Sequence, residues 1–185
     1  MSRTIKSLGG WTTVTHEILY SRRFLELQKI GGCYKYHQEG NAFTHSMLVY
    51  YNMCQLRPDD KRLQCVALLH DIGKLETGWV NEDGDWAYPN HSNVGADMLS
   101  QFIDPEYIYF EDMKWLIRNH IKPLFWRDKK LTKEQALITL SLYKGHFSME
   151  EIFNDLRFLV ICDLKGSIPA DYADSVETMN YLWSL

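Results

Sequence analysis

A histidine and an aspartate stand side by side at the end of an apolar run, where Leu68-Leu69 precedes His70-Asp71 and a glycine and a lysine follow. His70 continues an apolar stripe with helical spacing, so it is expected to point into the core, with Asp71 at the same rim. A carboxylate there costs free energy unless it is paired or binds a metal. An ordinary helix end, with a favourable histidine and a glycine stop, is the alternative interpretation.

Two other predicted helices also carry a histidine or an aspartate on a core-facing side. His45 shares its side with Val49 and Met53, and Asp163 ends a stripe that begins at Ile152. Taken singly, His45 could be a core histidine, and Asp163 could pair with a buried arginine or cap a helix. Taken as a set, imidazoles and carboxylates that converge from several helices can bind a divalent metal. Because no thiolate belongs to the set, Mn, Fe, Co, Ni and Mg are all candidates.

The elements that must position these groups are helices. Apolar periodicity, caps and glycine stops predict them over 12–30, 41–56, 59–71, 90–102, 104–120, 132–143, 148–166 and 170–183. The Asp83-Gly84 pair, flanked by tryptophans, is typical of a hairpin near 78–88, with a long loop that covers a site as the alternative. We therefore expect an all-α bundle with room for one small β-hairpin, in a single domain over residues 1–185.

Composition excludes several classes of partner and site. The net charge of -4 argues against nonspecific polyanion binding by the whole molecule. No stretch approaches the roughly 20 apolar residues of a membrane span, so no membrane partner is expected. The four cysteines are scattered without a CxxC pair, which disfavours a zinc-thiolate site and indicates a reducing, cytoplasmic compartment. The N-terminal residues lack the apolar segment of a signal peptide. The oligomeric state is left open.

The ordered set of His45, then His70-Asp71, then Asp163 resembles the HD-domain superfamily of metal-dependent phosphohydrolases. The stretch from Leu68 to Lys74 is similar to the central signature of that family almost letter for letter. Three shorter stretches look like the HD domain of bacterial tRNA nucleotidyltransferases: 91–96, 117–123 and 162–167. The resemblance covers roughly 41–167. Residues 1–40 could not supply a nucleotidyltransferase head, so it implies a free-standing hydrolase that does not add CCA.

The resemblance also bears on the number of ions. His91 and His120 fall where two-metal members of the superfamily place extra ligands, and in such sites the aspartate corresponding to Asp71 bridges both ions. In single-metal relatives similar histidines touch the substrate phosphate. Each of the two could also be a surface or capping histidine. One or two ions are therefore expected.

The chemistry implied is hydrolysis by a metal-activated water, since a divalent ion lowers the pKa of bound water. Asp71 could both ligate the ion and orient or deprotonate the water. Lys74 is the candidate phosphate clamp, with an ordinary helix-end lysine as the alternative. Arg118 and Lys122 lie on a basic line interleaved with aromatics and flank His120, so they are candidate substrate-binding residues. A solvated helix face is the alternative for that line.

The expected function is cleavage of a phosphomonoester or a (cyclic) phosphodiester of a nucleotide or nucleic-acid end. A deoxynucleotide phosphatase or triphosphohydrolase is the nearest alternative. Two further alternatives belong to other classes: a di-iron oxygenase built on the same ligands, and a nonenzymatic nucleotide-binding module.

Overall fold

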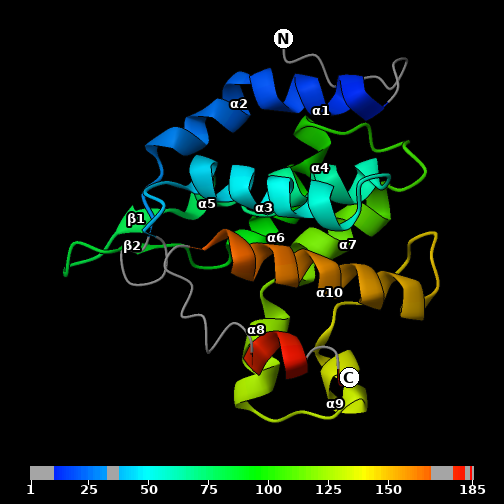
Figure 1. The fold of residues 1–185 in the computed structure, drawn as a ribbon. Helices are drawn as coiled ribbons and strands as arrows, with labels where there is room; N and C mark the ends of the chain where they lie inside the picture. The colour runs from blue at the N-terminus through cyan, green and yellow to red at the C-terminus, as the bar shows by residue number, and fades with distance from the viewer. Residues whose placement is uncertain (1–10, 33–37, 168–176, 182–183, 185) are drawn as a thin grey trace.

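The protein is described by a computed structural model that covers residues 11–32, 38–167, 177–181 and 184 (Figure 1). Helices dominate it, with one two-stranded sheet and two 3₁₀ helices, η1 and η2. In chain order the elements are α1 (Trp11–Tyr20), α2 (Arg22–Leu25), η1 (Glu26–Lys29), α3 (Ala42–Leu56), α4 (Lys61–Leu69), α5 (Lys74–Thr77), β1 (Trp79–Val80), β2 (Trp86–Ala87), α6 (His91–Met98), η2 (Leu99–Gln101), α7 (Phe110–Asn119), α8 (Lys122–Asp128), α9 (Lys133–Thr139) and α10 (Met149–Gly166). The predicted all-α class with a small hairpin is confirmed.

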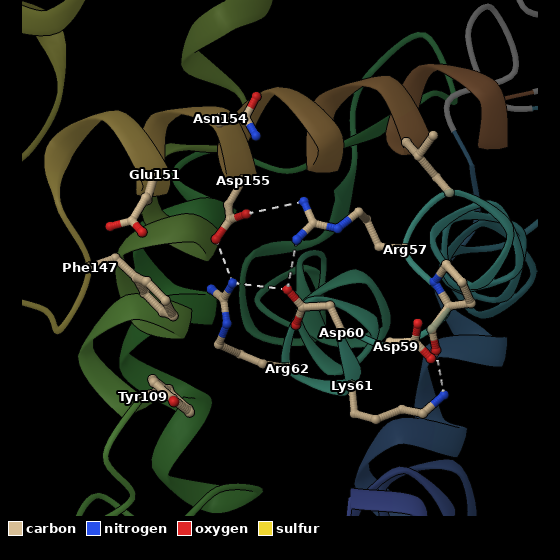
Figure 2. A pocket seen from close by; sticks show the side chains of 12 residues that line it. Arg57, Asp59, Asp60, Lys61, Arg62, Tyr109, Phe147, Glu151, Asn154 and Asp155 are labelled. Carbon is tan, nitrogen blue, oxygen red and sulfur yellow. Dashed lines mark hydrogen bonds and ion pairs between the residues drawn. The ribbon is translucent and has the colours of Figure 1, made fainter.

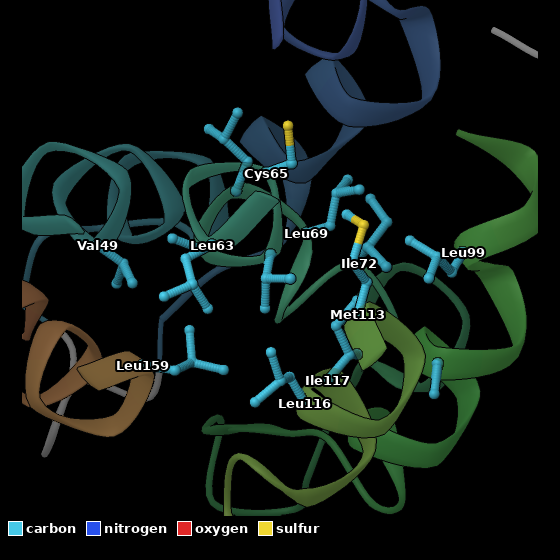
Figure 3. Close-up of a cluster of buried hydrophobic side chains, with 14 of the residues drawn as sticks. Val49, Leu63, Cys65, Leu69, Ile72, Leu99, Met113, Leu116, Ile117 and Leu159 are labelled. Atoms are coloured by element: carbon cyan, nitrogen blue, oxygen red, sulfur yellow. The ribbon is translucent and has the colours of Figure 1, made fainter. Parts of the chain in front are cut away.

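The centre of the bundle is formed by α3, α4, α7 and α10. The helix α3 packs on both α4 and α10, while α7 contacts α4, α10 and α6. Figure 1 shows α1 and α2 above this group and α8 and α9 below α10. The core between these helices is aliphatic: Leu63 and Leu69 of α4 meet Leu116 of α7 and Leu159 of α10, and all four are fully buried (Figure 3). Apolar burial of this kind is the dominant force that holds the helices together.

Side-chain caps fix where the central helices begin. Asn41 accepts a hydrogen bond from the backbone N–H of Thr44 (2.8 Å) at the start of α3, and Asp60 accepts one from Leu63 (3.0 Å) at the start of α4. Thr132 and Ser148 open α9 and α10 with the two capping boxes that the sequence predicts. These caps set the registers in which His45 and Asp163 face inward.

The predicted hairpin is present. Trp79 pairs with Ala87 and Val80 with Trp86 in antiparallel register. Gly84 has a φ of +83°, which explains why glycine occupies the tip. The hairpin lies beside α5 in Figure 1. Within the described residues, no helix combines the length and the apolar character that crossing a membrane requires.

Two predicted helices differ from the observed ones. The single helix expected over 12–30 is interrupted at Ser21, whose extended backbone and side chain cap a new helix by accepting the N–H of Phe24 at 3.1 Å. The helix expected from Asp104 begins only at Phe110. Asp104 is instead used in a turn, because its carboxylate accepts the N–H of Glu106 at 2.9 Å.

Two further predictions about the segment after α7 also fail. The helix expected over 132–143 ends at Thr139, because Leu140 has an extended backbone. The next residue, Ser141, is bonded to α7: its N–H donates to the Asn119 side chain (3.1 Å) and its carbonyl accepts from the Trp115 indole (2.8 Å). The short helix α8 was not expected after Pro123, although proline is tolerated in a first turn. Of the predicted helix 170–183, residues 177–181 are helical and most of the rest lies outside the described residues.

Candidate metal centre

Six predicted ligands come together at one end of the central helices. His45 lies one turn into α3, His70 and Asp71 follow the last residue of α4, and His120 follows the last residue of α7. His91 opens α6, and Asp163 lies near the end of α10. Four of these side chains are buried: His45, His70, Asp71 and His120. The other two, His91 and Asp163, keep slight exposure. The fold thus gathers groups that are far apart in the chain into one small volume.

The first half of the cluster surrounds Asp163. Its Oδ1 lies 2.8 Å from Nε2 of His45 and 3.6 Å from Nε2 of His70. The Oδ2 atom of Asp71 lies 3.7 Å and 3.4 Å from the same two nitrogens. Two imidazoles and two carboxylates therefore face a common point.

The second half of the cluster lies on the other side of Asp71. Its Oδ1 atom is 3.3 Å from Nε2 of His91 and 3.7 Å from Nε2 of His120. The ligand atoms of Asp71, His91 and His120 all lie within 4.8 Å of one another, as do those of His45, His70 and Asp71. The two oxygens of a single carboxylate thus face two different pairs of histidines.

Three of the histidines are held in the same way. Nδ1 donates to the carbonyl oxygen three residues earlier: His70 to Ala67 at 2.8 Å, His91 to Tyr88 at 2.9 Å and His120 to Ile117 at 2.7 Å. A proton fixed on Nδ1 leaves Nε2 as the atom that can bind a metal. Nε2 of His70 is fully buried and makes no hydrogen bond within the described part of the chain. A buried nitrogen in that state fits a divalent cation, so the donor set is suited to one.

The charges of the two carboxylates are stabilised within the cluster. Burial alone would raise the pKa of Asp71, but Lys74 and His70 outweigh it and hold that pKa well below its ordinary value. Asp163 behaves in the same way, because His45 and His70 outweigh its burial and lower its pKa strongly. Both carboxylates are therefore ionised at neutral pH in a site that is closed to most of the solvent.

The imidazoles of the two halves differ. Burial lowers the pKa of His70, but Asp71 and Asp163 outweigh it and raise the pKa to about 10. Burial also lowers the pKa of His120, and the nearby Asp71 carboxylate offsets this only in part. His120 is therefore neutral and ready to bind a cation, whereas His70 must lose a proton first.

Comparison with protein-family models matches residues 42–164 to the HD domain. The chain belongs to the HD-domain family. Members of that family are generally metal-dependent phosphohydrolases, in agreement with a cluster of histidines and aspartates that could hold a metal ion. A search of curated proteins gave no match. The narrower likeness to tRNA nucleotidyltransferases stays a prediction.

The predicted substrate-binding residues of this HD domain lie in different settings. Lys74 is buried, with Nζ 2.6 Å from Oδ2 of Asp71 and 4.9 Å from the centre of the Tyr88 ring. Arg118 pairs with Oδ1 of Asp97 on α6 at 2.7 Å. Lys122 donates to the carbonyl of Thr139 at 2.7 Å, and burial together with Arg118 lowers its pKa. Of these three residues, Lys74 alone forms an ion pair with the cluster, and the roles of all three stay predictions.

Sequence reasoning missed Glu39. The side chain of this residue is only 1% exposed, and its Oε1 lies 2.9 Å from Nδ1 of His45. No signal in the sequence singles it out, because it stands in a polar connector six residues before His45 and shares no helical face with it.

A hollow of about 680 Å³ lies at the opposite end of α4, lined in part by Arg57, Asp60, Arg62 and Asp155 (Figure 2). Since Arg62 and His70 are eight residues apart on one helix, the hollow is about 12 Å from the cluster along its axis. The four charges form a ring: Arg62 Nη2 is 2.5 Å from Asp155 and 3.2 Å from Asp60, and Arg57 is 3.7 Å and 3.4 Å from the same two. These groups already neutralise one another, so we assign the hollow a structural role.

Proposed function

We propose that this HD domain hydrolyses a phosphomonoester or a (cyclic) phosphodiester of a nucleotide or of a nucleic-acid end, with two divalent ions. The observation that carries the proposal is the placement of Asp71. One of its oxygens faces His45 and His70, and the other faces His91 and His120. A carboxylate shared in this way supports two neighbouring cation sites rather than one.

Under this proposal His45, His70, Asp71 and Asp163 hold one ion, and Asp71, His91 and His120 hold the other. When bound, divalent ions of this kind lower the pKa of water and neutralise charge on phosphoryl oxygens. Imidazole and carboxylate donors without thiolate suit Mn, Fe, Co, Ni or Mg. The hydrogen bonds from Nδ1 to backbone carbonyls keep the imidazoles oriented before any ion arrives.

The chain's own groups have distinct tasks in this proposal. Asp71 stays ionised, so it can orient an attacking water or accept its proton. Lys74 places a buried ammonium beside Asp71, where it can balance the charge of an incoming phosphate. Arg118 is available to a substrate because its partner Asp97 has a side chain that is 66% exposed, and such surface pairs are weak. Lys122 adds a second positive charge near Arg118.

The experiment measures hydrolysis of a substrate panel, with the products separated by chromatography, because opening a cyclic phosphodiester yields a phosphomonoester and no free phosphate. The panel contains nucleoside monophosphates, 2′,3′-cyclic phosphates, deoxynucleoside triphosphates and oligonucleotides with terminal phosphates, each with added Mn, Co, Ni or Mg. Wild type should hydrolyse at least one class only with metal, and Asp71→Asn should lose that activity. His16→Ala is the matched control, because this histidine is exposed and far from the cluster in the sequence.

Different outcomes discriminate the alternatives. Conversion of deoxynucleoside triphosphates alone, to deoxynucleoside and inorganic triphosphate, would assign a triphosphohydrolase. Oxygen consumption by the iron-loaded protein without hydrolysis of any substrate would assign an oxygenase and refute the proposal. Turnover retained in Asp71→Asn would show that the reaction takes place elsewhere.

A further inference from the structure

Glu39 stands in a short paired segment just before α3. Gly31 and Asn41 form an antiparallel bridge, Gly32 donates its N–H to the carbonyl of Gly40 at 3.0 Å, and Ala42 donates to Ile30 at 2.9 Å. Gly40 has a φ of +99°, a conformation that favours glycine, and it turns the chain between Glu39 and the cap of α3. The backbone that directly follows Glu39 is therefore held by hydrogen bonds to residues 30–32.

The carboxylate of Glu39 is buried, although a carboxylate in a loop would ordinarily face water. Its side chain is 1% exposed, and Oε1 lies 2.9 Å from Nδ1 of His45. Burying a carboxylate carries a large desolvation penalty unless a strong partner compensates it. The contact with His45 is a compensating partner of this kind.

His45 differs from the other three histidines of the cluster for a structural reason. His70 and His120 follow the last residues of α4 and α7, where carbonyl groups have no helical partner and can accept from Nδ1. Nδ1 of His91 likewise donates to the carbonyl oxygen of Tyr88, which precedes α6. His45 lies inside the first turn of α3, where the carbonyl three residues earlier belongs to the helix itself. Its Nδ1 therefore requires an acceptor from outside the helix, and the Glu39 carboxylate lies close enough to accept this hydrogen bond.

We propose that Glu39 is a positioning residue for the metal centre. Its carboxylate accepts the Nδ1 proton of His45, fixes the ring with Nε2 toward Asp163, and makes that nitrogen a stronger donor to a divalent cation. A carboxylate behind a ligating histidine typically contributes tenfold to a hundredfold in metal affinity. This inference rests on the proposed metal centre and adds a residue that acts through His45 without touching the ion.

The test is a double-mutant cycle read out as Mn²⁺ affinity by calorimetry. Glu39→Ala is expected to weaken binding by about tenfold to a hundredfold. Glu39→Gln should lose less, because its amide oxygen can still accept the proton but carries no charge. In a His45→Ala background, the ion that remains is the one expected at Asp71, His91 and His120. Glu39→Ala should leave its affinity unchanged, since there is no His45 ring left to position. Glu106→Ala, which removes an exposed carboxylate, is the matched control.

Each result supports or overturns the inference. Wild-type affinity in Glu39→Ala would overturn it. Weaker binding of the remaining ion when Glu39→Ala is added to His45→Ala would also overturn it, because that loss would indicate a general structural role. If Glu39→Ala does not fold, the near-isosteric Glu39→Gln decides between these outcomes in both backgrounds. A wild-type chain that binds no ion would overturn the proposed function and this inference together, whereas ion binding that is insensitive to Glu39 would overturn the inference alone.

Discussion

Asp71 divides the proposed metal centre into two halves that can be removed separately. Asp71→Asn should abolish both cation sites, because the carboxylate serves both. His91→Ala should abolish only the site on the Oδ1 side, and His45→Ala only the site on the Oδ2 side. The prediction is read out as the thermal stabilisation that Mn²⁺ confers on each variant.

The magnitude follows from linkage. One ion present at a hundred times its dissociation constant stabilises the fold by about 2.7 kcal/mol. In a chain of 150–250 residues, each kcal/mol shifts the melting temperature by about 2–4 °C. Wild type should therefore gain about 11–22 °C from two ions, each histidine variant about half of that, and Asp71→Asn close to nothing.

The assay is differential scanning fluorimetry with and without Mn²⁺, and the quantity compared is the difference within each variant. This choice matters because Asp71→Asn also leaves the buried Lys74 without its charged partner, which lowers the stability of the metal-free protein by about 3–5 kcal/mol. His16→Ala should match wild type. If His91→Ala loses the stabilisation by Mn²⁺ as completely as Asp71→Asn does, the division into two cation sites is refuted and a single ion is indicated.

Three further predictions concern individual side chains. The pKa of His70 is about 10 in the metal-free protein, so its proton must leave when an ion binds. The Mn²⁺ affinity should therefore rise by about tenfold per pH unit between pH 6 and 8. A pH-independent affinity in calorimetric titrations would contradict this. Lys74→Met should tighten Mn²⁺ binding by about tenfold or more, because it removes a positive charge beside Asp71, while it slows phosphate release; weaker binding would show that Lys74 supports the site instead. Burial raises the pKa of Cys65 and Cys162 to about 12, so iodoacetamide at pH 8 should label these two thiols only in denaturant. Labelling is measured by mass spectrometry, and labelled thiols in the native protein would show that the core opens.

The positions of the predicted ligands could be anticipated where helix periodicity carries them inward. His45 shares a stripe with Val49, and Asp163 ends an apolar stripe in α10, so their burial follows from local pattern. That the two side chains converge on one point does not follow from local pattern. It depends on α3 and α10 packing side by side, which is decided by side chains that are far apart in the chain.

The errors arise where a polar side chain competes with the apolar pattern. Ser21 interrupts an apolar period because its hydroxyl caps a new helix, and Asp104 forms a turn although it stands before a proline in an apparent helix start. Glu39 could not be found from sequence at all. Its side chain is buried against His45 close to the bridge between Gly31 and Asn41, and no local pattern predicts that bridge or the contact.

Metal stoichiometry is the most direct test of the central claim. Protein loaded with Mn²⁺, freed of excess ion by gel filtration and analysed by plasma mass spectrometry, should carry two ions per chain in wild type and none in Asp71→Asn. One ion per chain in His91→Ala would locate the second site. A wild-type chain without bound metal would contradict the account, because the cluster of histidines and aspartates would then be a network of ion pairs and nothing more.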